Sequence, residues 1–295
     1  MTPAVAAAPG PTVAAVLRDT ARRLGGAGIA TARQDAEALL ARALGTTRLG
    51  LYTTGRAPVP GAALGMFEAL VARRLRHEPI QYLLGETEFC GLVLAVGPGV
   101  FIPRPETEEL VSRALALGPS EAGTVLDLCA GSGAIACALA VRRPGWTVWA
   151  VEQAASAAAC ARANVQRLGL DGRVRVLDGD LFAPLAGRVP AGGVDLVVAN
   201  PPYLAAPLLR VLPVEVHDWE PRGAIDGGAD GLVVIRRLVG EAPAWLRSGG
   251  VALVEIGHEH GPATAALAGA DPRYAEVVVR RDFLGRERVL EGRRR

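Results

Sequence analysis

The sequence has little of several features that mark specialised classes of protein. Among its 295 residues there is no lysine, 4% are aromatic and only 4 are cysteine. No apolar run approaches the roughly 20 residues of a membrane-spanning helix, so no membrane segment is expected. The 36 glycines and 21 prolines follow no collagen-like period, and the apolar fraction of 50% is too high for a disordered chain. We expect a soluble globular protein with two domains, or one large domain with an appendage.

All of the positive side-chain charge comes from arginine. The 32 basic residues nearly balance 30 acidic residues, for a net charge of +2. No strong basic field therefore favours nonspecific nucleic-acid binding, and no stable nucleic-acid complex is expected. Codon bias explains the missing lysine, because Ala, Gly, Pro and Val are also abundant; the alternative is selection for bidentate anion recognition.

The four cysteines are too scattered for a zinc cluster or a disulfide framework, since no Cys-x-x-Cys pair occurs. Free thiols favour a cytoplasmic protein. Residues 1–11 lack a basic segment ahead of a long apolar stretch, so they do not resemble a signal peptide and are expected to be a flexible tail. The cysteines are Cys90, Cys129, Cys137 and Cys160.

The chain after this tail has the pattern of helices without strands. Apolar residues recur at helical spacing over residues 13–24, and a glycine pair closes that helix. Thr31 and Gln34 resemble a capping box for a second helix, which ends before Gly45. A third helix is expected over residues 62–76. These segments predict a small helical module.

The pattern changes near residue 86. Residues 86–96, with Gly91 among them, suit a short β-hairpin better than a helix. The expected organisation is a tail over residues 1–11, a helical domain over 12–84, a hairpin linker over 85–98 and a larger domain over 99–295.

From residue 123 onward, β-rich and helical segments alternate. Apolar strands separated by helices predict an α/β fold with a doubly wound parallel sheet. The expected strands are residues 124–128, 147–151, 174–177, 194–199, 251–256, 275–279 and 286–290. The expected helices are residues 134–142, 154–168 and 231–246 and a short one near Ala263.

The first candidate binding loop, Asp127-Leu-Cys-Ala-Gly-Ser-Gly133, leaves a strand and enters a helix. Gly131 and Gly133 allow backbone N–H groups to approach a ligand, and the helix N-terminus adds a positive dipole. Glu152 ends the next strand, where a carboxylate can accept both hydroxyls of a ribose. A tight turn would explain the glycines alone, but together these features indicate a nucleoside-bearing cofactor. The loop lacks the dinucleotide fingerprint and the P-loop lysine, which favours S-adenosylmethionine.

The second candidate loop, Asn200-Pro-Pro-Tyr203, follows a buried strand at the end where ligands bind in such sheets. Its prolines remove backbone donors and leave carbonyl oxygens and the Asn200 oxygen as acceptors. Two acceptors beside an aromatic ring suit a planar NH2 group, whose delocalised lone pair makes it a poor nucleophile. Holding its hydrogens favours pyramidalisation and aims the lone pair at a methyl donor, with Tyr203 stacked on the group. The structural alternative is a rigid turn.

Several longer motifs also occur in order along the chain. They are Glu78-Pro-Ile-Gln-Tyr-Leu-Leu-Gly85, Phe101-Ile-Pro-Arg-Pro-Glu-Thr-Glu-Glu-Leu-Val111, Glu220-Pro-Arg-Gly-Ala-Ile-Asp-Gly-Gly-Ala-Asp-Gly-Leu232 and Glu255-Ile-Gly257. With them, the sequence from about residue 73 onward resembles the release-factor glutamine-N5 methyltransferases, the HemK/PrmC family of class I S-adenosylmethionine-dependent enzymes.

This resemblance implies a seven-stranded Rossmann-like catalytic domain preceded by a helical substrate-recognition domain and a hairpin. It also implies methylation of the glutamine in the Gly-Gly-Gln motif of class-1 peptide chain release factors, and we expect a monomer. Asn200 and the Pro201 carbonyl are expected to orient the amide, with Pro202 and Tyr203 also at the substrate. The expected cofactor contacts are Cys129, Ala130, Gly131, Ser132, Gly133, Glu152, Asp180, Leu181 and Asn200, with no metal and no strong general base.

Three positions depart from the pattern of that family. Cys129 stands where glycine is frequent, and a similar cysteine in sister enzymes that methylate a ribosomal-protein glutamine keeps that substrate open. Against it, Pro103-Arg-Pro-Glu-Thr-Glu108 resembles the release-factor branch. Glu152-Gln153 replaces a commoner Asp-led pair and keeps the carboxylate on a longer arm. His260 replaces a usual glutamine, and nothing in the sequence explains that change.

Two other functions stay open at this point. An adenine-N6 nucleic-acid methyltransferase could use the same tetrapeptide to hold and stack an adenine. The small net charge and the lack of a basic recognition domain fit that activity less well. A noncatalytic cofactor-binding or scaffold protein is the alternative of a different class, and the retention of the residues needed for chemistry argues against it.

Two further segments have both a functional and a structural explanation. Asp180 could accept an adenine amino group and Leu181 or Phe182 could cover the ring, as in related enzymes, or they could be a helix cap and core residues. Arg104 and Glu106 could order a substrate loop or form a structural ion pair.

Histidines occur in two places outside these loops. His258 and His260, on either side of Glu259, are expected to be solvated polar residues rather than metal ligands. Residues 217–219, a His-Asp-Trp sequence, could help to form a channel for the glutamine.

Overall fold

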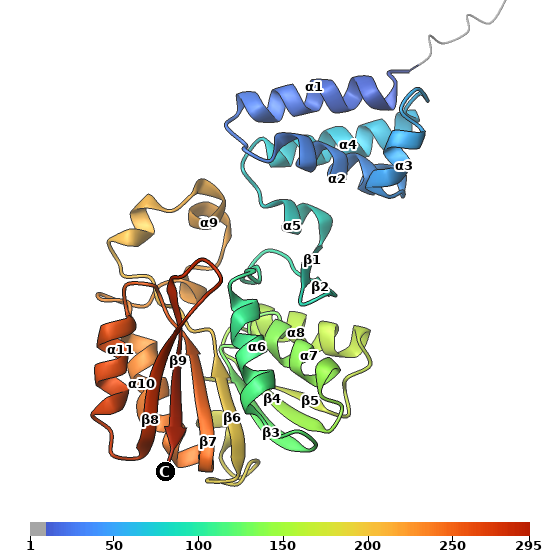
Figure 1. Ribbon diagram of the computed structural model, residues 1–295. Coiled ribbons are helices and arrows are strands. Elements are labelled where there is room, and N and C mark those ends of the chain that lie inside the picture. Colours follow the sequence, from blue (N-terminus) through green and yellow to red (C-terminus); the bar gives the residue numbers. More distant parts are fainter. Residues whose placement is uncertain (1–9) are drawn as a thin grey trace, which may run out of the picture. The chain divides into compact units, whose positions relative to one another are not determined.

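The computed structural model describes residues 10–295 (Figure 1). Most of the expected tail, residues 1–9, lies outside this range. Pro11, at the end of that tail, is held in place because its carbonyl accepts a hydrogen bond from the Val59 N–H at 2.9 Å. The chain divides into two compact units, one ending at Gly85 and the other running over Glu86–Arg295.

The first unit is helical over the residues that the structure describes. Its helices are α1 (Val13–Gly26), α2 (Ala32–Leu44), α3 (Arg48–Thr53), α4 (Gly61–Arg74) and α5 (Ile80–Leu84). The three expected helices are confirmed as α1, α2 and α4. The sequence did not predict α3 and α5, because five or six residues are too few to display a helical repeat.

The expected capping box at the start of α2 is wrong. Thr31 has ψ of 20° instead of the extended conformation of a capping residue, and its side chain makes no cap hydrogen bond within the described chain. Thr12 has the conformation of an N-cap residue at the start of α1, because its ψ is 154° and its hydroxyl accepts from the Ala15 N–H at 3.3 Å.

Asp35 and Glu37 are among the carboxylates that are buried in this helical unit with their partners in place. Asp35 accepts a hydrogen bond from Arg74 Nε at 2.7 Å, and both side chains are almost fully buried. Glu37 accepts from Arg33 at 2.5 Å and from Arg48 and Tyr52 at 2.7 Å each. Burial opposes the ionisation of Glu37, but these hydrogen bonds outweigh it and lower its pKa to about 2.

The hairpin that the sequence assigns to a linker packs as part of the second unit. Its strands are β1 (Glu86–Phe89) and β2 (Leu92–Ala95), joined by Cys90-Gly91 with φ of 50° and 75°, the left-handed pair of a two-residue hairpin turn. Phe89 and Leu94 are buried in the same apolar cluster as the large sheet. Asn164 anchors the second strand, since its amide binds both the N–H and the carbonyl of Ala95, at 2.7 and 3.0 Å.

The second unit contains, within the described residues, a seven-stranded sheet that confirms the expected α/β fold. The strand order is β5-β4-β3-β6-β7-β9-β8. The first five are parallel, and β9 is antiparallel to both of its neighbours. The strands are β3 (Gly123–Leu128), β4 (Trp146–Glu152), β5 (Val174–Asp178), β6 (Val194–Ala199), β7 (Leu246–Glu255), β8 (Tyr274–Arg281) and β9 (Glu287–Arg294).

Helices cover both faces of this sheet (Figure 1). Because side chains alternate along a strand, Leu196 and Val198 of β6 enter the apolar cluster under α6, α7 and α8, whereas Val197 and Ala199 enter the cluster under α10 and α11. These helices are α6 (Thr107–Leu117), α7 (Ala134–Arg142), α8 (Ala155–Arg167), α10 (Val233–Trp245) and α11 (Gly261–Gly269).

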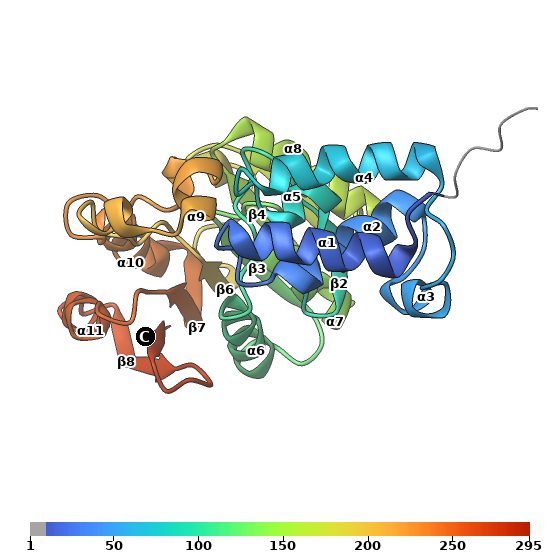
Figure 2. The same ribbon diagram turned by 90° about the horizontal axis from the view of Figure 1, so that it is seen from above.

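The sheet has its topological switch between β3 and β6. From β3 the chain continues to β4 and β5 on one side, and β6 lies on the other side. Ligands bind at the carboxyl edge next to such a switch. The segment that carries α9 (Val214–Trp219) lies beyond this edge, on the side of α10 (Figures 1 and 2).

No helix within residues 10–295 is both long enough and apolar enough to span a membrane.

Candidate active site

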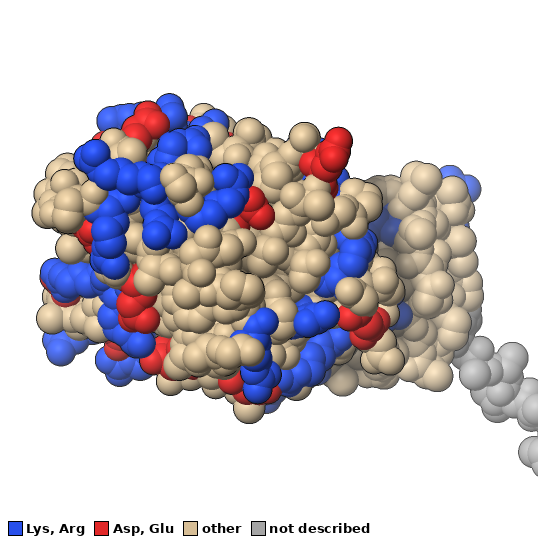
Figure 3. Space-filling model, turned by 90° about the horizontal axis from the view of Figure 1, so that it is seen from below, with Lys and Arg blue, Asp and Glu red and all other residues tan. Residues whose placement is uncertain are grey.

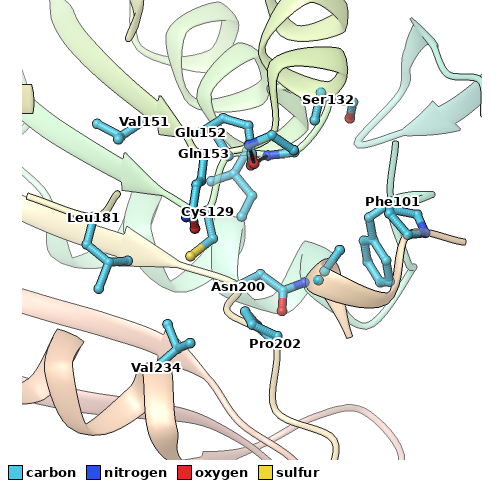
Figure 4. Close-up of a pocket in the computed structure, with 18 of the residues that line it drawn as sticks. Phe101, Cys129, Ser132, Val151, Glu152, Gln153, Leu181, Asn200, Pro202 and Val234 are labelled. Atoms are coloured by element: carbon cyan, nitrogen blue, oxygen red, sulfur yellow. Dashed lines mark hydrogen bonds between the residues drawn. The ribbon is translucent and has the colours of Figure 1, made fainter. Parts of the chain in front are cut away.

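A cavity of about 520 Å³ opens at the carboxyl edge of the sheet, next to the switch. Loops that follow β3, β4, β5 and β6 line it, together with parts of α6 and α10. Figure 4 shows Leu181 and Val234 at one end and Phe101 at the other, with Cys129 and Asn200 between them. The two candidate loops of the sequence therefore meet in one cavity.

The glycine loop presents its backbone to this cavity. Gly131 and Gly133 have φ of 57° and 76°, in the left-handed region that favours glycine. A Cβ on Gly133 would lie 3.1 Å from the Ala161 Cβ, whereas a Cβ on Gly131 would meet no described atom within 4 Å. Ser132, between them, lines the cavity, and its buried Oγ has no hydrogen-bond partner in the described chain. A polar ligand would supply the partner that this hydroxyl lacks.

Glu152 connects the glycine loop to the end of β4. One carboxylate oxygen accepts from the Gly131 N–H and the other from the Ala154 N–H, each at 2.8 Å. A carboxylate oxygen can accept two hydrogen bonds, so each keeps a free lone pair for a ligand hydroxyl. The longer glutamate arm thus orders the loop and leaves capacity to bind a ribose.

Cys129 lines the cavity in a conformation that is unusual for a residue with a side chain. Its φ is 59°, in the left-handed region. Burial raises the pKa of its thiol strongly, and the carboxylates of Glu152, Asp127 and Asp180 add to this effect. The residue therefore stays a neutral thiol and acts as a small wall of the cavity.

Asp127 is completely buried beneath the same loop. Its Oδ2 accepts from the Ala136 N–H at 2.9 Å, and its Oδ1 is without a hydrogen-bond partner in the region described. Burial raises the pKa of Asp127 to about 8, even though the bond from Ala136 favours the ionised form.

An ion pair between Arg237 and Asp180 lies at the end of the cavity that Leu181 and Val234 line, and the sequence did not predict it. Arg237 of α10 binds both oxygens of Asp180, at 2.8 and 3.2 Å, and both residues line the cavity. Leu181 and Val234 form the apolar wall beside this pair. Phe182 does not line the cavity, since it stacks on Trp245 with ring centroids 5.8 Å apart.

The Asn-Pro-Pro-Tyr loop contributes unequally to the cavity. Asn200 and Pro202 line it, whereas Pro201 and Tyr203 do not. The Asn200 Nδ2 donates to the Thr107 hydroxyl at 3.1 Å. This bond directs the nitrogen of the amide toward α6 and leaves its oxygen available as an acceptor.

Tyr203 is held by a buried glutamate of β7. Its hydroxyl donates to Glu255 Oε1 at 3.2 Å, and its ring packs against the apolar cluster under α10 and α11. Burial raises the pKa of Tyr203 strongly, and the Glu255 charge acts in the same direction. The partly buried ring thus packs against the core in this structure, outside the cavity where the sequence predicts that it stacks on a substrate.

An extended segment ahead of α6 forms the remaining wall. Phe101 and Pro103 line the cavity, and the Arg104 guanidinium lies 4.7 Å from the centroid of the Phe101 ring. Arg104 pairs with Glu220, which also accepts from the Ile102 N–H at 3.4 Å. Glu220, rather than the Glu106 that the sequence suggested, is the residue that secures this segment.

The histidines lie outside the cavity lining. His217 Nδ1 lies 2.5 Å from Asp218 Oδ1 on α9, a short helix with no buried residue in its described span. His258 Nδ1 and His260 Nε2 lie 3.2 and 3.7 Å from the Glu259 carboxylate. Within residues 10–295, no group of three or more His, Cys, Asp or Glu side chains could hold a metal ion.

Most of the site residues expected from the sequence therefore meet in one place. Those that line the cavity are Cys129, Ala130, Gly131, Ser132, Glu152, Asp180, Leu181, Asn200 and Pro202, and those that do not are Gly133, Pro201 and Tyr203. The residues that sequence reasoning missed are Thr107, Glu220, Val234, Arg237 and Glu255. All five lie in quoted motifs or expected helices, but only the fold shows which groups they contact.

Known families and proteins resemble this chain over most of its length. A family described as the PrmC N-terminal domain matches residues 15–85, and one described as the methyltransferase small domain matches residues 106–209. The release factor glutamine methyltransferase of Geobacter sulfurreducens is 41% identical over 282 residues, 96% of each chain. That of Mycolicibacterium smegmatis is 43% identical over 271 residues, 92% of this chain and 94% of the relative.

The fold is also similar to that of a solved structure. A methyltransferase from Pyrococcus furiosus covers 69% of this chain and 89% of its own, with a TM-score of 0.51 and 19% identity. At this identity, the similarity concerns the fold alone.

Proposed function

Since the chain belongs to the family of release factor glutamine methyltransferases, we propose that the cavity at the carboxyl edge of its sheet is where methyl transfer takes place. The protein is a methyltransferase that acts on a glutamine of a release factor. The proposed target is the N5 amide of the glutamine in the Gly-Gly-Gln motif of class-1 release factors. The observation that carries this proposal is the position of Asn200, whose amide faces the same cavity as the glycine loop.

The residues at one side of the cavity fit S-adenosylmethionine, on which this family depends. When bound, S-adenosylmethionine supplies an electrophilic methyl group. Gly131 faces open space, Ser132 Oγ lacks a partner within the described chain, and each oxygen of Glu152 retains a lone pair. We assign the ribose hydroxyls to Glu152 and the adenine amino group to Asp180, which Arg237 holds at the end of the cavity.

The Asn-Pro-Pro-Tyr loop holds the substrate amide. We assign one N–H hydrogen of the glutamine side chain to the Asn200 oxygen, which faces the cavity, and the other to the Pro201 carbonyl on the sequence pattern alone, since Pro201 is not among the lining residues. Both bonds reduce the conjugation of the amide nitrogen with its carbonyl. The nitrogen lone pair is then directed toward the methyl donor. Phe101 supplies an apolar wall at this end.

No strong base is needed in this reaction. The nitrogen becomes acidic once it carries the new methyl group, so its proton leaves readily to water. The roles of the residues are therefore to hold and orient the amide. Asn200→Ala should greatly reduce turnover while binding of S-adenosylmethionine is largely retained.

The proposal extends to the partners and the compartment of the protein. We propose a cytoplasmic monomer whose helical unit takes part in recognising the release factor, without stable nucleic-acid binding. The small net charge of +2 supports the last point, although basic side chains gather at one side of the face shown in Figure 3, with a few acidic ones beside them.

The test uses the full-length protein, labelled S-adenosylmethionine and a purified class-1 release factor. A release factor with Gln→Ala in its Gly-Gly-Gln motif is the matched control, and a ribosomal protein and DNA are alternative acceptors. We expect label on the unchanged release factor alone. Label on DNA, on the ribosomal protein in preference, or equally on the changed factor would overturn the proposed substrate.

A further inference from the structure

Glu220 is the buried anchor of the chain segment that runs from the Asn-Pro-Pro-Tyr loop to α10. In the described stretch 210–224 its side chain is 2% exposed, whereas every other residue there is partly or fully exposed. An apolar side chain could hold this segment at lower cost, because a buried carboxylate loses its hydration. The use of a carboxylate here therefore directs attention to the groups that it binds.

Those groups belong to the extended segment ahead of α6. Glu220 Oε1 accepts a hydrogen bond from the Arg104 guanidinium, 116 residues away in the sequence, and Oε2 accepts from the Ile102 N–H at 3.4 Å. Burial raises the pKa of Glu220, and the charge and hydrogen bond of Arg104 counteract part of this effect. Both carboxylate oxygens are thus used to hold one distant segment of the chain.

Arg104 connects Glu220 to a ring that lines the cavity. Its guanidinium lies over the Phe101 ring, with the guanidinium carbon 4.7 Å from the ring centroid, within the range of a cation–π contact. Phe101 lines the cavity (Figure 4), and so does Pro221, which follows Glu220 in the chain. Glu220 therefore joins two walls of the same cavity.

We infer that Glu220 is a positioning residue for the substrate glutamine, which acts through Arg104 to fix the Phe101 ring at the wall of the cavity. The inference rests on the proposed function, in which Phe101 forms the wall at the end that holds the glutamine amide. The ring limits where the amide nitrogen lies relative to the methyl donor. Arg104 is 31% exposed, so without the Glu220 charge it can turn toward solvent and leave the ring free to move.

Three variants of the full-length protein test this path: Glu220→Gln, Phe101→Ala and the variant with both changes. Glu220→Gln keeps the shape and can still accept from the Ile102 N–H, but it removes the ion pair. We expect it to lower kcat for the release factor about tenfold, because a bound substrate that is misoriented reacts more slowly. KM and the Kd for S-adenosylmethionine should stay within about twofold of the wild type. Phe101→Ala should lower kcat by about tenfold or more.

The double variant separates positioning from a structural role. If Glu220 acts through Phe101, adding Glu220→Gln to Phe101→Ala should lower kcat by less than about a further twofold. Independent effects would multiply to a loss of about 100-fold, and that result would overturn the inference. A wild-type kcat in Glu220→Gln or in Phe101→Ala would overturn it as well.

Glu291→Gln is the matched control for loss of a buried carboxylate that an arginine holds. Glu291 of β9 accepts from Arg113 at 2.6 and 3.2 Å and lies outside the cavity lining. Its kcat, expressed per molecule that binds S-adenosylmethionine, should equal that of the wild type. A tenfold loss in this control would overturn the inference, because loss of any such carboxylate would then have the same effect.

Two further points keep the outcomes distinguishable. Arg104→Gln breaks the same ion pair from its more exposed side, and it replaces Glu220→Gln in the same set of variants if that protein does not fold. A wild type that methylates no release factor would overturn the proposed function itself. A methylating wild type whose kcat is insensitive to the ion pair would overturn only the role of Glu220.

Discussion

Two buried carboxylates of the sheet unit, Asp127 and Glu255, differ from Glu37 of the helical unit in their hydrogen bonding. In the helical unit, three side chains donate to Glu37 and lower its pKa to about 2. In the sheet unit, Asp127 and Glu255 each have one oxygen without a well-formed hydrogen bond to the described residues, and burial raises their pKa to about 8 and about 7. The first arrangement stabilises the charge, and the second does not.

The difference separates residues that hold the fold from residues that serve the cavity. A saturated carboxylate has no capacity for another ligand, and its removal damages only the structure around it. Asp127 lies beneath the glycine loop, and Glu255 accepts from Tyr203 of the loop that also carries Asn200. We therefore expect substitutions of these carboxylates and of Glu37 to have different effects.

The largest effect is expected from Asn200→Ala in the sheet unit. Loss of the acceptor that orients the substrate amide should lower kcat by about 100-fold or more, as for a lost transition-state hydrogen bond in other enzymes. The free energy of unfolding should change little, because Asn200 lines a cavity. Steady-state methylation assays with calorimetric measurement of S-adenosylmethionine binding check both points, and unchanged turnover would contradict the account.

Glu37→Gln in the helical unit should show the reverse pattern. It weakens the hydrogen bonds from Arg33, Arg48 and Tyr52, and we expect a loss of about 2 kcal/mol in the free energy of unfolding. Chemical denaturation of the full-length protein measures this loss. At temperatures where the variant is folded, kcat should equal that of the wild type. A large fall in kcat without a loss of stability would remove the distinction between the two units.

Lowering the pH should also show how much Glu37 contributes to stability. The pKa of Glu37 is about 2 in the folded protein against an ordinary value of 4.5, so its contribution to stability is fully present above about pH 4.5. That contribution is lost as the pH falls toward about 2, because the unfolded chain then binds the proton first. The difference in stability between the wild type and Glu37→Gln should therefore shrink over this range. A constant difference would show that the Glu37 charge has no such partners.

The smallest effect is expected from Asp127→Asn. With a pKa of about 8, Asp127 is mostly neutral at pH 7, and an asparagine oxygen can still accept from the Ala136 N–H. Below about pH 4, where Asp127 is neutral in both the folded and the unfolded chain, the free energy of unfolding should change by less than about 1 kcal/mol. Because folding raises the pKa of Asp127, the stability of the wild type falls as the pH rises toward about 8. The stability of the variant relative to the wild type should therefore increase between about pH 5 and about pH 9. Denaturation at both pH values tests this, and a relative loss by the variant would contradict it.

The sequence was sufficient to predict site residues that belong to a local motif directly after a strand. The glycine loop, Glu152 and Asn200 could be identified because each follows an apolar strand, and parallel strands bring their carboxyl ends to one edge. The alternation of apolar strands with helical segments along the chain likewise predicted the α/β fold with a doubly wound sheet.

The sequence was insufficient where the outcome depends on contacts between distant segments. Arg237 meets Asp180, and Thr107 meets Asn200, only after helices pack on the sheet. The direction of Tyr203 was also not predictable, because a ring next to the cavity loop can turn toward the cavity or toward Glu255. Thr31 failed as a cap because its ψ is set by the preceding turn and not by its residue type.

The central claim is tested most directly by locating the methyl group. The release factor is incubated with S-adenosylmethionine and either the wild type or Asn200→Ala, then digested and mapped by tandem mass spectrometry. We predict one added methyl group on the side-chain amide of the Gly-Gly-Gln glutamine with the wild type and none with Asn200→Ala in the same time. A methyl group on another residue, or equal modification by both proteins, would contradict it.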